Sequence, residues 1–470
     1  MNTISLNKKI IDFLIIMILS ISAYAQDRSL SNVPQAKKTT FPVQSKGSLW
    51  FTSDILQYQG RENRTRIDIV YSVNLSKYWQ ESQILDSLLL LDIHCHIFDS
   101  EGVLLSETTR NKKFTPGSED TVQASTYIDI IQYSLIPGEY EIKLTIKDSV
   151  HTDVKGTTEH FITVRDFSER FSLSDIYFIA DIQESEKRTS ERKNRFERNG
   201  YLLIPNIQRS YLNTEQEQLF IYYEINNLDF NEESKNYYHA YYSISDIEDK
   251  EVRSGKKEWL VADASGIGRF ENFSVADLPS GIYKITVKTV DLQNDNFSSI
   301  TSYFVVTAPK QQYAGILPMT ETDIERYIKQ IRYIATDQEI EVFKQLNKEG
   351  KQNFLLDFWE SKDPDPSTKE NEFMQEHFQR LAYAKANFRG GIESDMGRVY
   401  ITYGPPQDVE REHSNIRNFK SAIIWYYALE GKVRFVFVDR TGDGIYSLVH
   451  STKYDEYSDP DWREKYMRNQ

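Results

Sequence analysis

The feature that most constrains this chain of 470 residues is an internal repeat in its β-rich part. The pattern LIPGEYEIKLTI, a Pro/Gly turn followed by an alternating run, recurs as LPSGIYKITV. Tyr140 and Tyr283 in these runs are 143 positions apart (283 − 140), and Phe161 and Phe304 in the following runs have the same separation (304 − 161). An equal offset across two strands indicates that one structural unit occurs twice.

Each copy has the pattern of the closing strands of an immunoglobulin-like sandwich. Alternation at 67–73 and 91–97 adds strands with one face in a core and the other in water. We therefore predict two tandem immunoglobulin-like β-sandwiches, at 47–166 and 170–308. The charged stretch 184–199 is expected to be a solvated loop and not a binding patch.

After Pro309 the hydrophobic period changes from two to that of a helix. Thr336 and Glu339 have the spacing of a capping box, and apolar stripes predict further helices as far as Gly390. Alternating runs then predict strands, at 398–403, 423–428, 433–438 and 445–450. The part from 320 to 465 is thus predicted to be an α+β domain, and the whole chain a multidomain, mainly β protein.

The first 25 residues have the pattern of a secretory signal peptide. Lys8 and Lys9 precede a short apolar run, and the sequence AYA stands directly before Gln26 as a cleavage site. The apolar run is shorter than a membrane span requires. We expect export to the periplasm or the outer cell surface, a polar linker at 26–46, and no integral membrane segment after cleavage.

The charge of the chain limits its partners, and its cysteine content limits how it is stabilised. The chain has 56 Lys and Arg against 70 Asp and Glu, a net charge of −14, whereas binding to nucleic acid or to an anionic membrane requires a basic surface. The single cysteine, Cys95, excludes an internal disulfide. Alternation places Cys95 on a core face, where we expect a buried, inert thiol. The expected partner is another protein of the cell envelope.

Several blocks of the C-terminal part resemble, in order, the GWxTD domain family. They are NFLLDFWE, ENEF, RLAYA and GRVYITYGPP. The naming motif is altered to GIESD, with Ile392 in place of Trp and Ser394 in place of Thr. The resemblance covers about 330–460. It implies an exported Bacteroidetes-type envelope protein of unknown biochemical function, in which β-sandwich repeats precede the GWxTD domain, and it supplies no catalytic mechanism.

One group of residues in this part is a candidate recognition site. It comprises Asp395, Arg398, Tyr400, Tyr403, Gly404, Pro405 and Pro406. A carboxylate and a guanidinium beside a rigid turn can orient a polar ligand, and the two prolines limit the entropy that binding would cost. The structural alternative is that Asp395 caps a turn, Arg398 pairs with it and Tyr403 packs.

Two further patterns suggest metals, and for each we favour a structural interpretation. Asp92, His94 and His96 share one strand face at i, i+2 and i+4, but wet strand faces commonly carry such residues. The run DRTGDG from Asp439 resembles the start of a calcium loop, but the twelfth position is His450 and the flanks are predicted strands. We expect a turn in which glycines adopt positive φ, and no metal or other cofactor.

Motifs of nucleophilic, zinc-dependent and nucleotide-binding enzymes are absent from the sequence, and we predict no catalytic residue. The first hypothesis is a non-enzymatic exported envelope protein, with sandwiches as scaffold and the C-terminal domain recognising a protein or ligand. The acidic segment 455–461, interleaved with Tyr454, Tyr457 and Trp462, favours a contact surface. The alternative is an envelope-polymer hydrolase with its site around Asp395, Arg398 and His450.

Overall fold

A computed structural model of the chain describes residues 41–75, 89–114, 126–168, 170–184, 195–233, 235–309, 321–366, 368, 370–412, 420–429 and 431–467. The predicted signal peptide lies outside these residues, as do 26–40 of the predicted linker and 185–194 of the charged stretch. The end of that linker is already part of the fold, because two short strands begin at Val43 and Lys46 and pair with later ones.

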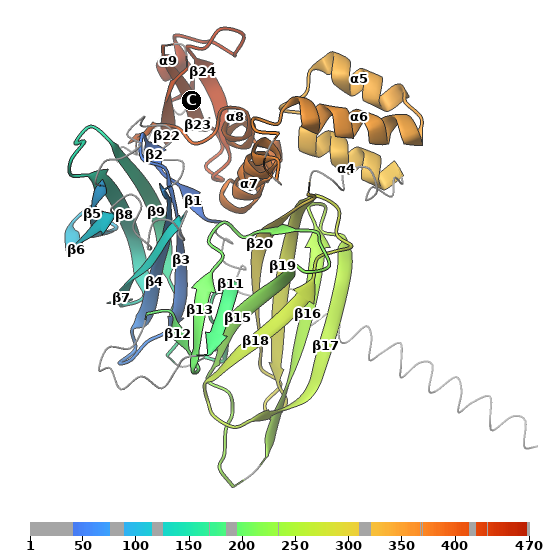
Figure 1. The fold of residues 1–470 in the computed structure, drawn as a ribbon. Helices are drawn as coiled ribbons and strands as arrows, with labels where there is room; N and C mark the ends of the chain where they lie inside the picture. Colours follow the sequence, from blue (N-terminus) through green and yellow to red (C-terminus); the bar gives the residue numbers. More distant parts are fainter. Residues whose placement is uncertain are drawn as a thin grey trace, which may run out of the picture. The chain divides into compact units, whose positions relative to one another are not determined.

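Two antiparallel sheets pack on each other in the first sandwich (Figure 1). One has the order β1 (Val43–Gln44), β3 (Phe51–Gln59), β4 (Thr65–Asn74), β7 (Thr126–Leu135). The other has the order β2 (Lys46–Gly47), β9 (Lys155–Val164), β8 (Gly138–Asp148), β5 (Leu89–Asp99), β6 (Leu104–Phe114). Alternate residues of both sheets form the core. Cys95 lies in it, and burial raises the pKa of its thiol to about 11.

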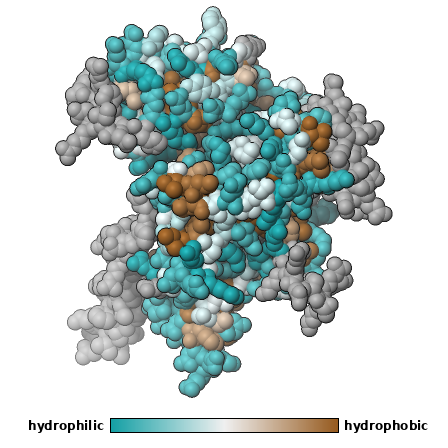
Figure 2. Space-filling view, turned by 90° about the vertical axis from the view of Figure 1, so that its left-hand side faces the viewer, coloured by the Kyte–Doolittle hydropathy of each residue, from teal (hydrophilic) through white to brown (hydrophobic). Residues whose placement is uncertain are grey.

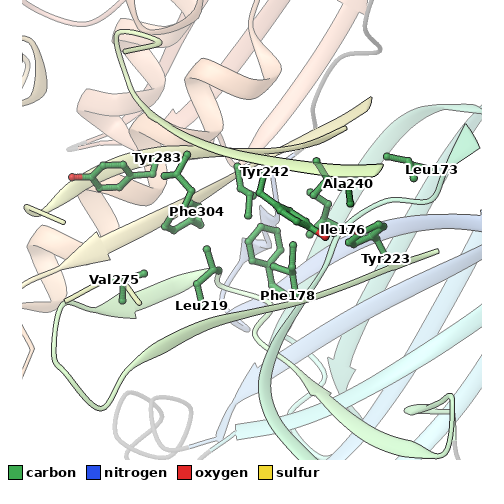
Figure 3. Close-up of a cluster of buried hydrophobic side chains, with 14 of the residues drawn as sticks. Leu173, Ile176, Phe178, Leu219, Tyr223, Ala240, Tyr242, Val275, Tyr283 and Phe304 are labelled. Atoms are coloured by element: carbon green, nitrogen blue, oxygen red, sulfur yellow. Dashed lines mark hydrogen bonds between the residues drawn. The ribbon is translucent and has the colours of Figure 1, made fainter. Parts of the chain in front are cut away.

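The second sandwich also has two sheets, which are antiparallel except that β14 and β20 pair in parallel. Its first sheet contains β10 (Ser172–Leu173), β15 (Gln218–Asn226), β11 (Tyr177–Glu184), β13 (Tyr201–Pro205) and β12 (Glu197–Arg198), with β18 (Ile267–Ser274) on β15. Its second has the order β14 (Ser210–Leu212), β20 (Phe297–Thr307), β19 (Gly281–Asp291), β16 (Asn236–Asp246), β17 (Glu251–Ala262). Aromatic side chains from both sheets, among them Phe178, Tyr223, Tyr283 and Phe304, meet in its core (Figure 3).

The repeated tyrosine marks a hydrogen bond that is present in both copies. The hydroxyl of Tyr140 donates to the carbonyl of Ile136 (3.0 Å), and that of Tyr283 donates to the carbonyl of Pro279 (2.7 Å). A tyrosine near the start of a late strand that bonds to the backbone just before it is the tyrosine corner of immunoglobulin-like sandwiches. The predicted fold class, a multidomain and mainly β protein, is confirmed.

The second half of the repeat, at the phenylalanines, differs from the prediction by one residue. Tyr140 pairs with Ile162, whereas Tyr283 pairs with Phe304. The turn between the two closing strands is one residue shorter in the second copy. Phe304 is therefore equivalent to Ile162 and not to Phe161. Phe161 is therefore 53% exposed, while Phe304 is fully buried.

The C-terminal part has helices first and a small sheet after, as predicted. The helices are α4 (Glu321–Ile331), α5 (Asp337–Gln345), α6 (Lys348–Ser361), α7 (Glu372–Asn387), the 3₁₀ helix η2 (Gly391–Glu393), α8 (Asp395–Tyr403) and α9 (Trp462–Tyr466). The antiparallel sheet has the order β21 (Asp408–Glu412), β22 (Ala422–Ala428), β23 (Lys432–Asp439), β24 (Tyr446–Ser451). The predicted capping box is present, since Thr336 and Glu339 satisfy each other's backbone N–H groups at the start of α5.

The strand predicted at 398–403 is wrong, because these residues form most of α8. The β-forming residues of this segment suggested a strand. Met396, Val399 and Tyr400 are buried, however, and lie at i, i+3 and i+4, which is the spacing of one helix face. The Ser394 hydroxyl, which accepts from the N–H of Gly397 (3.0 Å), caps the first turn.

Buried ion pairs join the two sandwiches. Arg209 of the second sandwich pairs with Asp54 of β3, and Arg198 of β12 pairs with Asp68 of β4. All four side chains are at most 7% exposed. This corrects the prediction for the charged stretch, since its described end at Arg198 is buried against the first sandwich and is not a solvated loop.

The helices and the second sandwich share an apolar cluster. Ile282, Tyr303 and Val305 of the sandwich pack in one core with residues of α4 to α7, and α7 lies against β19 and β20. None of the helices in the described residues is long and apolar enough to cross a membrane. On the face drawn in Figure 2, a hydrophobic patch lies within a mostly hydrophilic surface.

Candidate functional site

The candidate site is built around α8, whose start is tied to the sheet. Asp395, in the first turn, accepts a hydrogen bond from the backbone N–H of Leu448 in β24 (2.8 Å). Gly397 lies so close to Gly391 that an added Cβ would stand 2.2 Å from its carbonyl oxygen. Only glycine fits at this position. The GIESD motif, which begins at Gly391, therefore forms a close turn that packs against the first turn of α8.

Arg398 pairs with Glu456, not with Asp395 as the structural alternative proposed. Its two terminal nitrogens donate to the two carboxylate oxygens at 2.8 and 2.7 Å, and the hydroxyl of Tyr403 donates to the same carboxylate at 2.9 Å. Burial alone would raise the pKa of Glu456, but the hydrogen bonds and charge of Arg398 hold it below its usual value. We call this arrangement of Arg398, Tyr403 and Glu456 the clamp.

The remaining predicted site residues have packing roles. Tyr400 is 5% exposed and stacks on Tyr383, with ring centroids 4.4 Å apart. The carbonyl of Gly404 accepts from the hydroxyl of Tyr427 (3.0 Å), and Gly404 ends α8 with φ of 79°. Pro406 is buried and Pro405 half-buried. The structure therefore brings Arg398 and Tyr403 together and directs Tyr400 into the core.

Glu456 belongs to a segment that presents aromatic side chains to solvent. We call 452–461 the aromatic loop. Tyr454 in it is 85% exposed and Tyr457 is 53% exposed, whereas Trp462, directly after it, is 3% exposed and packs in a core. The clamp holds the loop at Glu456, between the two exposed tyrosines. Sequence reasoning missed Glu456 because 58 positions separate it from Arg398.

Two of the three residues of the hydrolase alternative already have partners, since Asp395 accepts from the backbone of Leu448 and Arg398 pairs with Glu456. His450 is 4% exposed, and burial lowers the pKa of its imidazole. The carboxylate of Asp439 accepts from the N–H groups of Gly442 (2.7 Å) and Gly444 (2.9 Å), both at positive φ, as the turn interpretation predicted.

The three residues considered as metal ligands are half-buried on the outer face of β5 and contact side chains of β6. Asp92 accepts from Asn111, His94 lies 3.3 Å from the hydroxyl of Thr109, and the third, His96, approaches a glutamate. Within the described residues, no group of three or more His, Cys, Asp or Glu side chains is placed to hold a metal ion.

The fold and the site define a multidomain, mainly β protein with an α+β domain at its C-terminal end. Residues 293–464 match the family model of the GWxTD domain, so this part of the chain is a GWxTD domain, as its sequence blocks indicated. The match begins before β20, the strand against which α7 packs.

No curated protein matches the chain. Among solved structures, the crystal structure of Parabacteroides merdae beta-glucuronidase is similar with a TM-score of 0.19 and 10% sequence identity, covering 57% of this chain and 34% of that one. The chain thus spans about a third of the length of that protein.

Proposed function

We propose that this protein is an exported cell-envelope protein in which the two sandwiches are a scaffold and the GWxTD domain recognises a protein partner through the aromatic loop. The observation that carries the proposal is the clamp. A tyrosine that is 85% exposed lies two residues from a carboxylate fixed by two charge-assisted hydrogen bonds. Holding a loop in place before binding lowers the entropy that a partner must offset.

The residue types of the loop support a protein partner. Tyrosine is enriched among the residues that dominate protein interfaces, because its ring offers contact area and its hydroxyl a hydrogen bond. Tyr454 and Tyr457 lack the burial that would give them a role in a core. The charges of Asp395 and Arg398 are already engaged in structural contacts, and this favours recognition over hydrolysis.

Capture from envelope extract tests the proposal. The mature chain and its Tyr454→Ala/Tyr457→Ala variant would be used as bait, with Tyr201→Ala as the matched control, since Tyr201 is also an exposed tyrosine but lies on β13. We expect one or more envelope proteins to be retained by the wild type and the control and lost from the double variant. Equal retention by all three would refute a role for the loop.

A truncation after Pro309 would be a poor bait. Ile282, Tyr303 and Val305 lie in the core shared with the helices, so removing the C-terminal part would expose apolar surface that binds proteins non-specifically. Arg398→Lys is a better second variant, because lysine keeps the charge but cannot make the two-pronged contact with Glu456. We expect it to weaken capture without abolishing it.

Export rests on the sequence pattern of the first 25 residues. Amino-terminal sequencing of the protein from fractionated cells would test it directly. We expect a mature chain that starts at Gln26 in the envelope fraction; recovery of an uncleaved chain in the cytoplasm would contradict the proposal.

A further inference from the structure

The second sandwich has an extra residue in its edge strand β17 that the equivalent strand of the first sandwich, β6, lacks. β17 lies at the edge of the sheet formed by β14, β20, β19, β16 and β17. In the first copy, β6 pairs with β5 without interruption from Leu89 to Ile97. In the second copy, β17 pairs with β16 at Tyr238 and again at Ala240, and two residues of β17, Glu258 and Trp259, lie opposite the single residue between them. β17 accordingly has 12 residues where β6 has 11.

This irregularity is a β-bulge, and it directs a tryptophan onto the outer face of the sheet. Trp259 has φ of 55°, a left-handed conformation that is strained for a residue other than glycine. The residue is 64% exposed, and the centroid of its ring lies 6.0 Å from that of Tyr237 and 5.3 Å from that of His239. Bulges at sheet edges commonly re-aim a side chain next to a functional site.

The rings around Trp259 form a continuous surface. Alternate residues of β16 face outward beside it, and Phe297 of β20 extends the surface across the sheet. His239 and Tyr241 have ring centroids 6.2 Å apart, and Phe297 is 53% exposed. Half-buried Val290 of β19 lies between His239 and Phe297. We call this surface the aromatic face; it comprises Tyr237, His239, Tyr241, Trp259, Val261, Val290 and Phe297.

Charged groups lie between these rings and not only around them. The ammonium of Lys256 stands 5.1 Å from the ring centroid of Tyr241 and forms an ion pair with Glu258. The ammonium of Lys288 stands 4.8 Å from the ring centroid of Phe297 and forms no ion pair with any of the residues that the structure describes. Two lysines and one glutamate give the face a net positive charge on a chain whose net charge is −14.

We propose that the aromatic face binds an acidic glycan, a polymer of pyranose rings that carry carboxylates. The C–H groups on one side of a pyranose ring pack on the electron-rich face of an aromatic ring, and the exposed rings of Trp259 and Phe297 offer such faces. The unpaired ammonium of Lys288 complements a sugar carboxylate, and the Tyr241 hydroxyl and Glu258 can pair with sugar hydroxyls.

The composition favours a glycan over the other macromolecules. The core of a protein interface is depleted in charged residues and surrounded by a polar rim, whereas here the charges interleave with the rings, and the aliphatic members of the face are two valines, Val261 and Val290. A nucleic acid requires many uncompensated cations. On this face, the ammonium of Lys288 is the uncompensated cation, because Lys256 pairs with Glu258.

Affinity electrophoresis of the mature chain in native gels tests the proposal. The gels would contain polygalacturonate, alginate or hyaluronan as acidic polymers, or hydroxyethyl cellulose as a neutral one. We expect at least one acidic polymer to retard the wild type, Trp259→Ala to weaken that binding at least tenfold, and Lys288→Gln to weaken it several-fold and reduce its salt dependence. Hydroxyethyl cellulose should retard the wild type much less.

A matched control separates this face from the aromatic loop. Tyr454→Ala also removes an exposed aromatic side chain, but in the GWxTD domain, and should leave glycan binding unchanged. Conversely, Trp259→Ala should leave capture of the protein partner unchanged, so that the two proposals fail independently. Circular dichroism and thermal unfolding would establish that each variant is folded.

Three results would overturn the proposal: no retardation of the wild type by any of the acidic polymers, retardation that persists undiminished in Trp259→Ala, or equal retardation by the neutral polymer. Loss of a captured envelope protein on Trp259→Ala, without glycan binding by the wild type, would reassign the face to a protein partner.

Discussion

The outer faces of β5 and β16 occupy the same place in the two copies, yet they carry different chemistry. On β5, Asp92 and His94 contact Asn111 and Thr109 of β6, so the face carries polar side chains that interact across the two strands. On β16, His239 and Tyr241 take the equivalent positions and belong to a surface of rings. One kind of sandwich core therefore supports either face, since the fold depends on the inward side chains and the outward ones are free to differ.

The largest effect is expected where the copies are joined. Arg209→Ala should lower the free energy of unfolding by about 3–5 kcal/mol, because Asp54 would remain buried without its partner. Urea unfolding would measure this. Arg253→Ala is the control, since the Asp277 partner of Arg253 is 72% exposed, and such pairs contribute about 0–1 kcal/mol. A loss below about 1 kcal/mol for Arg209→Ala would indicate that the copies are joined mainly by apolar contacts.

The next effect depends on a buried histidine that the second copy lacks. His160 lies 2.7 Å from the Ser53 hydroxyl, and burial lowers the pKa of its imidazole to about 4; the equivalent residue is Ser302. Because the folded pKa is below the unfolded value of about 6.5, stability is complete above pH 6.5 and is lost as pH falls towards 4. The expected loss from this group at pH 5 is about 2 kcal/mol.

Urea unfolding at pH 7 and pH 5 would test the assignment. His160→Gln should reduce the loss on acidification by that amount. Some acid sensitivity should remain, because burial also lowers the pKa of His377, in α7, to about 4. If His160→Gln leaves the pH dependence unchanged, the sensitivity resides elsewhere.

The two tyrosine corners should contribute nearly equally to the free energy of unfolding, as expected if the two copies are equivalent. Tyr140→Phe and Tyr283→Phe each remove one hydroxyl that donates to a backbone carbonyl. Each should lower the free energy of unfolding by about 1 kcal/mol, the usual net value of such a bond. Thermal or urea unfolding of the two variants would show it; a difference above about 1 kcal/mol would mean that the two corners are not equivalent in energy.

The smallest change in stability is expected where the faces differ most. Trp259→Gly should alter the free energy of unfolding by less than about 0.5 kcal/mol, because glycine adopts the left-handed conformation without strain and this offsets the lost ring contacts. His94→Ala, on the equivalent face of the first copy, should be as mild. Glycan binding should be lost only in the former. A destabilisation above about 2 kcal/mol by Trp259→Gly would assign the tryptophan a structural role.

Local patterns predicted most of the elements. Alternation identified strands such as β5, and a capping box identified the start of α5. The prediction of a strand at α8 is wrong because the residue types of this segment suit a strand while their spacing suits a helix. The cap by the Ser394 hydroxyl and the contact of Asp395 with β24 favour the helix.

The sites were less accessible from sequence because they depend on register and on distant partners. Arg398 and Tyr403 were recognised as candidates, but Glu456, which joins them, follows from tertiary structure alone. Trp259 belongs to the bulge in β17. The bulge is recognised only when the register of β16 and β17 is compared with that of β5 and β6.

The bulge in β17 also bears on the solubility of the chain. An open edge strand with an exposed tryptophan is a template on which a strand of another molecule could add and start a fibre. The pairing of β17 is interrupted twice, and Lys256 and Lys257 stand in its middle, so the strand is too twisted and too charged to extend the sheet. The bulge that brings the ring to the surface thus also disfavours strand addition. The protein can expose an aromatic side chain at a sheet edge without associating with itself through that edge.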